Sequence, residues 1–208
     1  EILAQHDYGG LFHPPSEKGT IQMPGWGGGA NWYGAGFDPD TGYLYVPSRT
    51  SPISVTLQKA DPERSDFNYM RGPSRLSGPQ GLPLVKPPWG RITAIDLNTG
   101  DHLWMVPLGS APRDVREHPD LQGLGLDFST MGQNGRPGAL VTSTLLFMGE
   151  GGGVRGGVAS RHGAGGPVFR AYDKRTGEVV AAITLPANPT GSPMSYMLNG
   201  RQYIVVAA

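Results

Sequence analysis

Two segments of the chain share one layout, GRITAIDLNTGDHLW at residues 90–104 and PVFRAYDKRTGEVVA at residues 167–181. Each contains an apolar strand-like run, an Ala-x-Asp triplet, two further residues, a Thr-Gly pair and a second strand-like run. The Asp carboxylate can accept hydrogen bonds from backbone amides across the turn, and Gly can adopt the positive φ that tight turns require. Each segment predicts a β-hairpin, and its recurrence predicts a repeated architecture.

Shorter strand-like runs precede each hairpin, so each repeat holds four strands. A third unit shows two strands joined at Asn199-Gly200. Repeated four-stranded antiparallel units are typical of β-propeller blades. We therefore expect an all-β fold of about two and a half blades, with residues 1–208 forming one partial propeller. The expected blades span residues 34–108 and 138–186, with a half blade at 192–208.

Three segments interrupt the strand pattern and are expected as inserted loops, at residues 50–89, 110–137 and 149–166. The first is rich in proline, the second joins the two repeats, and the third is half glycine. The first and third fall at the same place in their repeats. Insertions at one position of a repeat lie on one face of the array, which is often the binding face.

Composition excludes several classes of function. The 17 Lys and Arg residues balance the 17 Asp and Glu residues, so no global field favours nucleic acid. No apolar run approaches the roughly 18 residues of a membrane span. The chain has no Cys, and its five His lack metal-ligand spacing, so we expect no metal site in it.

Residues 28–46 resemble a known family. The stretch GGANW at 28–32, leading into GFDPDTGYLYV at 36–46, is similar to the pyrroloquinoline-quinone (PQQ)-dependent dehydrogenases, nearest the glucose-type branch. PPWG at 87–90 and SPMSY at 192–196 extend the match over essentially the whole chain outside the inserted loops. The Ala-x-Asp-x-x-Thr-Gly unit is shared with cofactor-free propellers and indicates fold only, whereas GGANW is the specific part.

The resemblance implies an eight-bladed quinoprotein propeller, exported to the periplasm, with PQQ lying on a calcium ion in the central channel. The chain would be the carboxy-terminal portion of such a propeller and form a section of its channel wall. Electrons from a sugar or alcohol would pass to PQQ. Calcium ligands and catalytic residues are expected outside this chain, so the chain alone should be inactive. Its expected partner is the rest of the propeller or another copy of the chain.

Four residues are candidates for cofactor binding. Asn31 follows three small residues that let a ligand approach the backbone, and the resemblance puts it at the family's cofactor-contacting asparagine. Trp32 can close the pocket by apolar contact. Asn134 and Gly138 enter an innermost strand, where family members place residues near the quinone. The alternatives are a turn-capping role for Asn31, interblade packing for Trp32 and a polar turn at Asn134.

Two further expectations concern architecture and function. Trp104 sits where the family's repeat places a tryptophan that docks on the adjacent blade, and Ala181 holds the matching position in the second repeat. Asp38, Asp96 and Asp173 belong to hairpin turns, so we assign no catalytic residue. The alternative function is a cofactor-free propeller acting as a scaffold or binding module, like the outer-membrane assembly lipoproteins.

Overall fold

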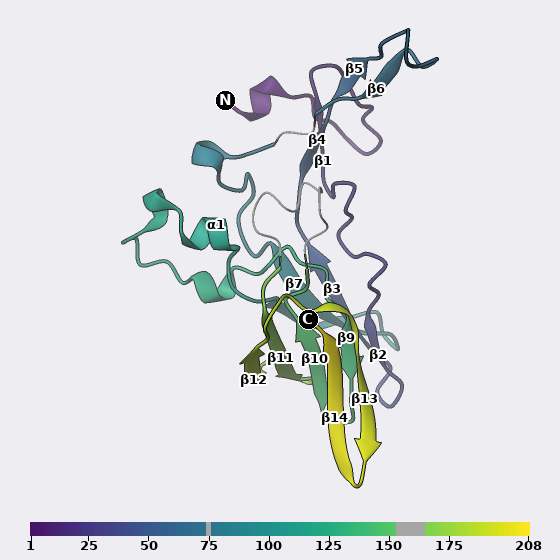
Figure 1. The fold of residues 1–208 in the computed structure, drawn as a ribbon, viewed down its shortest axis with the longest axis vertical. Coiled ribbons are helices and arrows are strands. Elements are labelled where there is room, and N and C mark those ends of the chain that lie inside the picture. Colours follow the sequence, from purple (N-terminus) through teal and green to yellow (C-terminus); the bar gives the residue numbers. More distant parts are fainter. Residues whose placement is uncertain (74–75, 153–164) are drawn as a thin grey trace. The chain divides into compact units, whose positions relative to one another are not determined.

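The computed structural model describes residues 1–73, 76–152 and 165–208 (Figure 1). The chain divides into two compact units. The first comprises Glu1–Gly28 and Ser51–Lys86, and the second comprises Gly29–Thr50 and Pro87–Ala208. The second unit carries both repeats.

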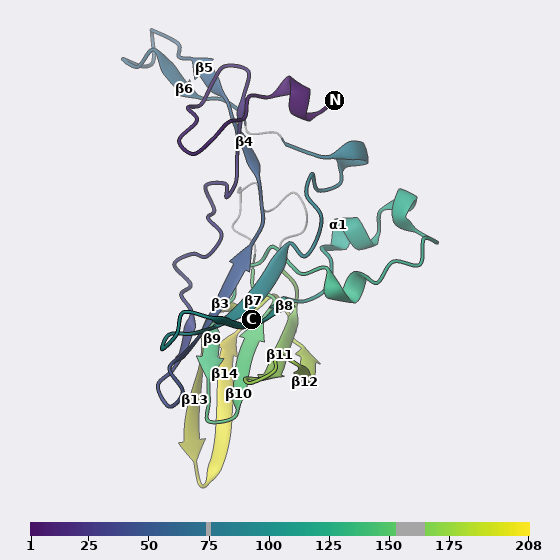
Figure 2. The same ribbon diagram turned by 180° about the vertical axis from the view of Figure 1, so that it is seen from behind.

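Three antiparallel sheets make up the second unit, and Figure 2 shows their strands from behind. Two sheets have four strands and the third has two, which confirms the expected all-β fold. The first sheet, in the order β2-β3-β7-β8, consists of β2 (Gly36–Asp38), β3 (Tyr43–Arg49), β7 (Gly90–Asp96) and β8 (His102–Pro107). The second, in the order β9-β10-β11-β12, consists of β9 (Ala139–Val141), β10 (Leu145–Gly149), β11 (Val168–Asp173) and β12 (Val179–Thr184). The third consists of β13 (Thr190–Leu198) and β14 (Arg201–Ala207).

The first two sheets repeat each other in register as well as in strand order. Ala94 of β7 pairs with Trp104 of β8, and Ala171 of β11 pairs with Ala181 of β12. In both sheets the register shifts immediately after this pair, which is where a β-bulge places an extra residue. The two hairpins are therefore structurally equivalent, as their sequences predict.

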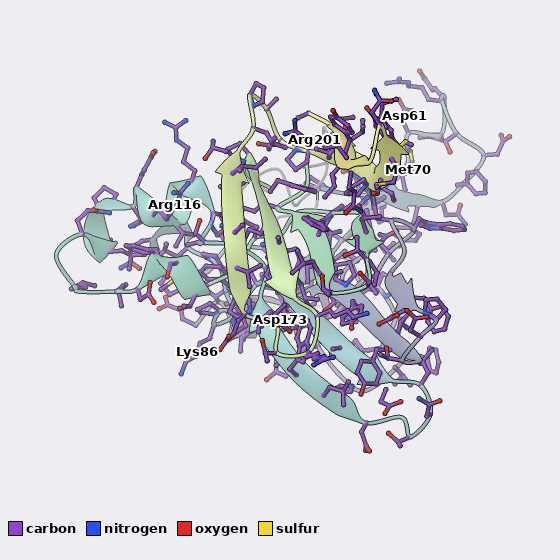
Figure 3. All side chains as sticks on the ribbon, turned by 90° about the horizontal axis from the view of Figure 1, so that it is seen from below. Asp61, Met70, Lys86, Arg116, Asp173 and Arg201 are labelled. Atoms are coloured by element: carbon purple, nitrogen blue, oxygen red, sulfur yellow. The ribbon has the colours of Figure 1, made fainter. Side chains whose placement is uncertain are left out.

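The repeated turns use the predicted chemistry. The Oδ1 of Asp96 accepts a hydrogen bond from the Asn98 amide at 2.8 Å, and that of Asp173, labelled in Figure 3, accepts one from the Arg175 amide at 2.7 Å. The glycine that closes each turn has a positive φ, 82° at Gly100 and 77° at Gly177. These carboxylates serve the turns through backbone hydrogen bonds, as expected.

The core lies between the two four-stranded sheets. Its buried side chains come from both of them: Tyr45, Ile92 and Ala94 from the first, and Leu146, Met148 and Tyr172 from the second, with Leu108 directly after β8. Side chains on a strand alternate between its two faces, so each sheet turns one apolar face to its neighbour. Face-to-face packing of successive sheets is the arrangement expected of propeller blades.

Trp104 fixes the first sheet to the second. Its indole Nε1 donates a hydrogen bond to the backbone carbonyl of Lys174 at 3.3 Å. Its ring lies over Gly177, where an added Cβ would stand 2.8 Å from a ring carbon. The predicted docking of Trp104 on the adjacent blade is therefore confirmed.

A buried ion pair joins the same two sheets. The Nζ of Lys174 lies 2.6 Å from the Oδ2 of Asp38, and the two side chains are 6% and 3% exposed. Lys174 also donates to the Thr142 carbonyl, and Asp38 accepts from the Thr41 hydroxyl and the Asp40 amide. Asp38 thus holds its own turn and the neighbouring blade at once.

The inserted segments contain more structure than the expected loops. In the first unit β1 (Thr20–Gln22) pairs with β4 (Ile53–Val55), and β5 (Leu57–Lys59) pairs with β6 (Tyr69–Arg71), so residues 50–89 hold three strands. All three residues of Ile53–Val55 are buried, and the two β-branched side chains in it favour a strand. The first unit also holds 3₁₀ helices at Leu3–Gln5 and Pro79–Gly81.

Residues 110–137 form α1 (Arg113–Arg116) and 3₁₀ helices at Pro119–Leu121 and Phe128–Thr130. Most of the expected loop at 149–166 lies outside the described residues. Of the helices in the described ranges, none has the length and hydropathy needed to cross a membrane.

Gly90, at the start of β7, is expected to tolerate no side chain. A Cβ there would run into the backbone carbonyl of Gln133. The Gln133 amide donates a hydrogen bond to the Leu108 carbonyl, which holds this segment in place. Because the obstacle is backbone, Gly90→Ala should lower the free energy of unfolding by about 3 kcal/mol, the upper part of the usual range for overpacking. Urea unfolding measures this loss of free energy of unfolding. Gly10→Ala, where open space surrounds the added Cβ, is the control, and equal losses in both variants would contradict the close approach.

Candidate functional site

Asn31 lies in the loop that leads into β2. Its Oδ1 accepts a hydrogen bond from the Trp32 amide at 2.7 Å, and its carbonyl accepts one from the Gly34 amide at 2.9 Å. These two bonds make a tight turn, so the turn-capping role considered from the sequence is present. The same residue also lines a pocket, so the two roles coexist at Asn31.

Three segments of the second unit meet at this pocket. They are the loop before β2, the final residues of β3, and the stretch before β9. Glycine and proline make up half of the lining, and the polar groups come from an amide, a phenol, a hydroxyl and two guanidiniums. The lining residues are Gly29, Asn31, Tyr33, Gly34, Pro47, Ser48, Arg49, Gly135, Arg136 and Pro137. The cavity volume is about 20 Å³, which suits one small polar group rather than a whole ring system.

Arg49 is a charged residue at a buried position. Along β3 the buried residues alternate as Tyr45, Pro47 and Arg49, and the Arg49 residue is 6% exposed. One of its Nη atoms donates to the Asn134 carbonyl at 3.4 Å. Burial, and after it the positive charge of Arg136, lower the pKa of Arg49 to about 10. At neutral pH the guanidinium still carries its charge.

Arg136 brings a second guanidinium to the same pocket from the stretch before β9. Its central carbon lies 6.0 Å from the centre of the Tyr33 ring, within the range of a cation–π contact. Its Nε is buried and has no hydrogen-bond acceptor among the described residues. A buried donor of this kind is available to a ligand.

The four sequence candidates have different surroundings. Asn134 is 5% exposed, its carbonyl binds Arg49, and its Oδ1 is buried with no donor among the described residues. Gly138 packs against β13, since a Cβ there would lie 2.5 Å from the Cα of Ser192. Trp32 is 98% exposed and lies outside the pocket lining. The contacts of these residues with a quinone stay predictions.

Sequence reasoning missed Arg49, Arg136 and Tyr33 as pocket residues. The alternation of β3 carried a signal for Arg49, because a strand that buries Tyr45 and Pro47 also turns residue 49 inward. Arg136 and Tyr33 lie in irregular segments, where no periodicity indicates which way a side chain points.

A metal centre is not assembled by the residues that the structure describes. No three His, Cys, Asp or Glu side chains among them come together at a distance that would hold an ion. The buried carboxylate of Glu150 is paired instead, with its Oε1 2.8 Å from a guanidinium nitrogen of Arg170.

Comparison with known proteins shows that the chain is similar to curated dehydrogenases. The chain is 32% identical over 230 residues to the glycerol dehydrogenase large subunit of Gluconobacter oxydans, covering 97% of this chain and 29% of that protein. It is 29% identical to the quinoprotein glucose dehydrogenase of Escherichia coli, covering 100% of this chain and 26% of that protein. The chain thus spans less than a third of the length of these curated relatives.

Solved structures support the fold. A quinohemoprotein alcohol dehydrogenase from Pseudomonas putida matches 90% of this chain and 23% of its own, with a TM-score of 0.54 and 18% identity. The quinohemoprotein alcohol dehydrogenase from Comamonas testosteroni matches 88% of this chain and 23% of its own, with a TM-score of 0.52 and 24% identity.

The family model described as the glucose/ethanol/alcohol dehydrogenase β-propeller domain, which belongs to the PQQ enzymes, matches residues 1–204. This match agrees with the propeller fold that the repeated four-stranded sheets and the Trp104 contact indicate. The chain therefore belongs to the PQQ-dependent dehydrogenase family and forms about two and a half blades of its propeller.

Proposed function

We propose that the chain forms a section of the channel wall in a quinoprotein that oxidises a sugar or an alcohol and passes the electrons to bound PQQ. Three observations support this: the family match over residues 1–204, the position of Asn31 in the pocket lining, and the unpaired donor at Arg136. The family match also favours the enzyme over a cofactor-free scaffold. By the same resemblance we propose a periplasmic location.

The pocket suits one edge of the cofactor. PQQ is a planar quinone with carbonyl and carboxylate edges, and when bound it supplies the two-electron acceptor. The Asn31 amide can donate to a carbonyl oxygen from a loop whose short turn limits its movement. A cavity of about 20 Å³ admits an edge of the quinone and not its rings.

The rest of the catalytic machinery is proposed to come from outside this chain. The chain spans 29% of the glycerol dehydrogenase large subunit, and its turn aspartates are engaged by backbone amides. We propose that the calcium ligands, the general base and the remaining blades belong to the rest of the propeller. By itself the chain should then show no turnover.

Removing the Asn31 side chain should weaken quinone binding in the complete protein that carries this chain. Asn31→Ala removes a donor and an acceptor, so the binding free energy should fall by about 1–3 kcal/mol. Fluorescence titration of the cofactor-free protein with PQQ measures the change. Asn98→Ala, at the exposed β7–β8 turn, is the control and should bind as the wild type does. Unchanged affinity in Asn31→Ala would count against the proposed contact.

A further inference from the structure

The pocket beside Asn31 holds two guanidiniums from two different blades. Arg49 comes from the end of β3 in the first blade, and Arg136 comes from the stretch that enters β9 in the second. Both side chains line the same cavity, and Tyr33 and Ser48 add a phenol and a hydroxyl. Such a convergence places two positive charges and several donors around a space sized for one small group.

Two like charges held close together and out of water destabilise the folded protein. The Arg49 residue is 6% exposed, and the charge acting to lower its pKa is that of Arg136. The buried carboxylate of Glu150 is engaged by Arg170. A bound anion between the guanidiniums would offset their repulsion and satisfy the buried Nε of Arg136.

We propose that Arg49 and Arg136 form a subsite that binds a carboxylate group. Guanidinium groups bind carboxylates through paired N–H···O hydrogen bonds, and the planar fork of arginine matches the two oxygens. The cavity volume of about 20 Å³ suits a carboxylate while the remainder of the ligand stays outside. Because the two arginines come from different blades, the subsite exists only when the blades are packed together.

Assigning this carboxylate to a ligand of an enzyme rests on the proposed function. Within that function the carboxylate can come from two sources. One is a carboxylate of PQQ, and the other is a carboxylate carried by a hydroxy-acid substrate. The residues that recognise the group are the same in both cases, so the sources are separated by experiment.

The first experiment tests the subsite without the cofactor. Oxalate, a small dicarboxylate, is titrated by calorimetry into the cofactor-free complete protein and into its Arg136→Gln variant. Loss of a charged hydrogen-bonding partner should weaken oxalate binding by about tenfold or more. Arg175→Gln removes an equal charge at an exposed turn and should stay within about twofold of the wild type by the usual size of exposed charge effects.

Arg49→Lys provides a second variant that keeps the buried charge and loses the planar fork. It should also weaken oxalate binding, while its thermal unfolding reports whether the fold survives. No oxalate binding by the wild type, or equal binding by the wild type and Arg136→Gln, would overturn the subsite.

The second experiment separates the two sources. If the carboxylate belongs to PQQ, Arg136→Gln should weaken PQQ binding by about tenfold, and KM should change little at saturating PQQ. If it belongs to a substrate, PQQ affinity should hold and the KM for glycerate should rise about tenfold, while the KM for the neutral polyol glycerol should not. Weaker oxalate binding with neither of these effects would overturn the assignment of the subsite to an enzyme ligand. A wild type that binds oxalate through Arg136 but never binds PQQ would leave the subsite standing and refute the proposed function.

Discussion

Lys174→Met is expected to lower the free energy of unfolding by about 3–5 kcal/mol, because it leaves the Asp38 carboxylate buried without its cation. The two groups lie 2.6 Å apart, with side chains 6% and 3% exposed, so water cannot replace the lost partner. Urea or thermal unfolding of the complete protein measures the change. The pair joins two blades, and the loss should therefore appear in the cooperative unfolding of both.

Lys18→Met is the matched control for this prediction. Lys18 and Asp7 form a pair at 3.1 Å whose side chains are 49% and 35% exposed, and such pairs contribute about 0–1 kcal/mol. Adding Asp38→Asn to Lys174→Met should restore part of the stability, because the uncompensated charge is then gone. Equal effects of Lys174→Met and Lys18→Met would show that the buried pair contributes nothing special.

The Asp38–Lys174 pair should make the stability of the contact between the two blades depend on pH. Burial acts to raise the pKa of Asp38, but hydrogen bonds from Lys174, Thr41 and the Asp40 amide outweigh it and hold the pKa below its usual 3.8. A carboxyl with a lowered folded-state pKa contributes stability above its unfolded-state value and loses that contribution as pH falls through the folded-state value. Stability should therefore drop below about pH 4, and the drop should be smaller in the Asp38→Asn variant.

Trp104→Ala is expected to cost about 3–5 kcal/mol, the range for truncating a large aromatic in a packed interior. The indole bonds the Lys174 carbonyl at 3.3 Å and stands 5.7 Å, between ring centres, from buried Tyr45. Removing it leaves a void against Gly177 and an unpaired carbonyl. Thermal unfolding should show the loss directly.

Two further substitutions make this prediction specific. Trp104→Phe keeps an aromatic ring and loses the N–H donor, so it should cost less than the alanine variant and report chiefly the hydrogen bond, about 1 kcal/mol. Trp32→Ala makes the same truncation at a side chain that is 98% exposed, and should change stability by about 0.5 kcal/mol or less. If Trp104→Ala were as mild as Trp32→Ala, the docking contact would have no energetic weight.

Local pattern was enough to predict the repeat, because the turn and the hairpin depend on neighbouring residues. Asp96 and Asp173 bind amides two residues away, and Trp104 sits at a fixed place in the hairpin. Period-two alternation and turn residues can be recognised from residues that are close together in the sequence. The fold class follows from them.

Contacts between blades were not predictable in this way. Asp38 and Lys174 are 136 positions apart, and the sequence assigns Asp38 to a hairpin turn without indicating its partner. Arg49 and Arg136 meet only when two blades pack. In each case tertiary packing brings the partner residue close, and a single sequence contains no local pattern that identifies this partner. Of the four candidates, Asn31 lines the pocket, and the sequence did not indicate the two guanidiniums beside it.

The two interblade joints of this chain are built differently. Trp104 fills the first joint, whereas Ala181 stands at the equivalent place in β12, beside an apolar cavity of about 410 Å³ that extends to Ile204 and Val205 of β14. A joint with fewer packed atoms separates at a lower free energy. The β13–β14 hairpin, which begins its return strand at Arg201 (Figure 3), can therefore part from the second blade in local fluctuations that leave the first joint closed.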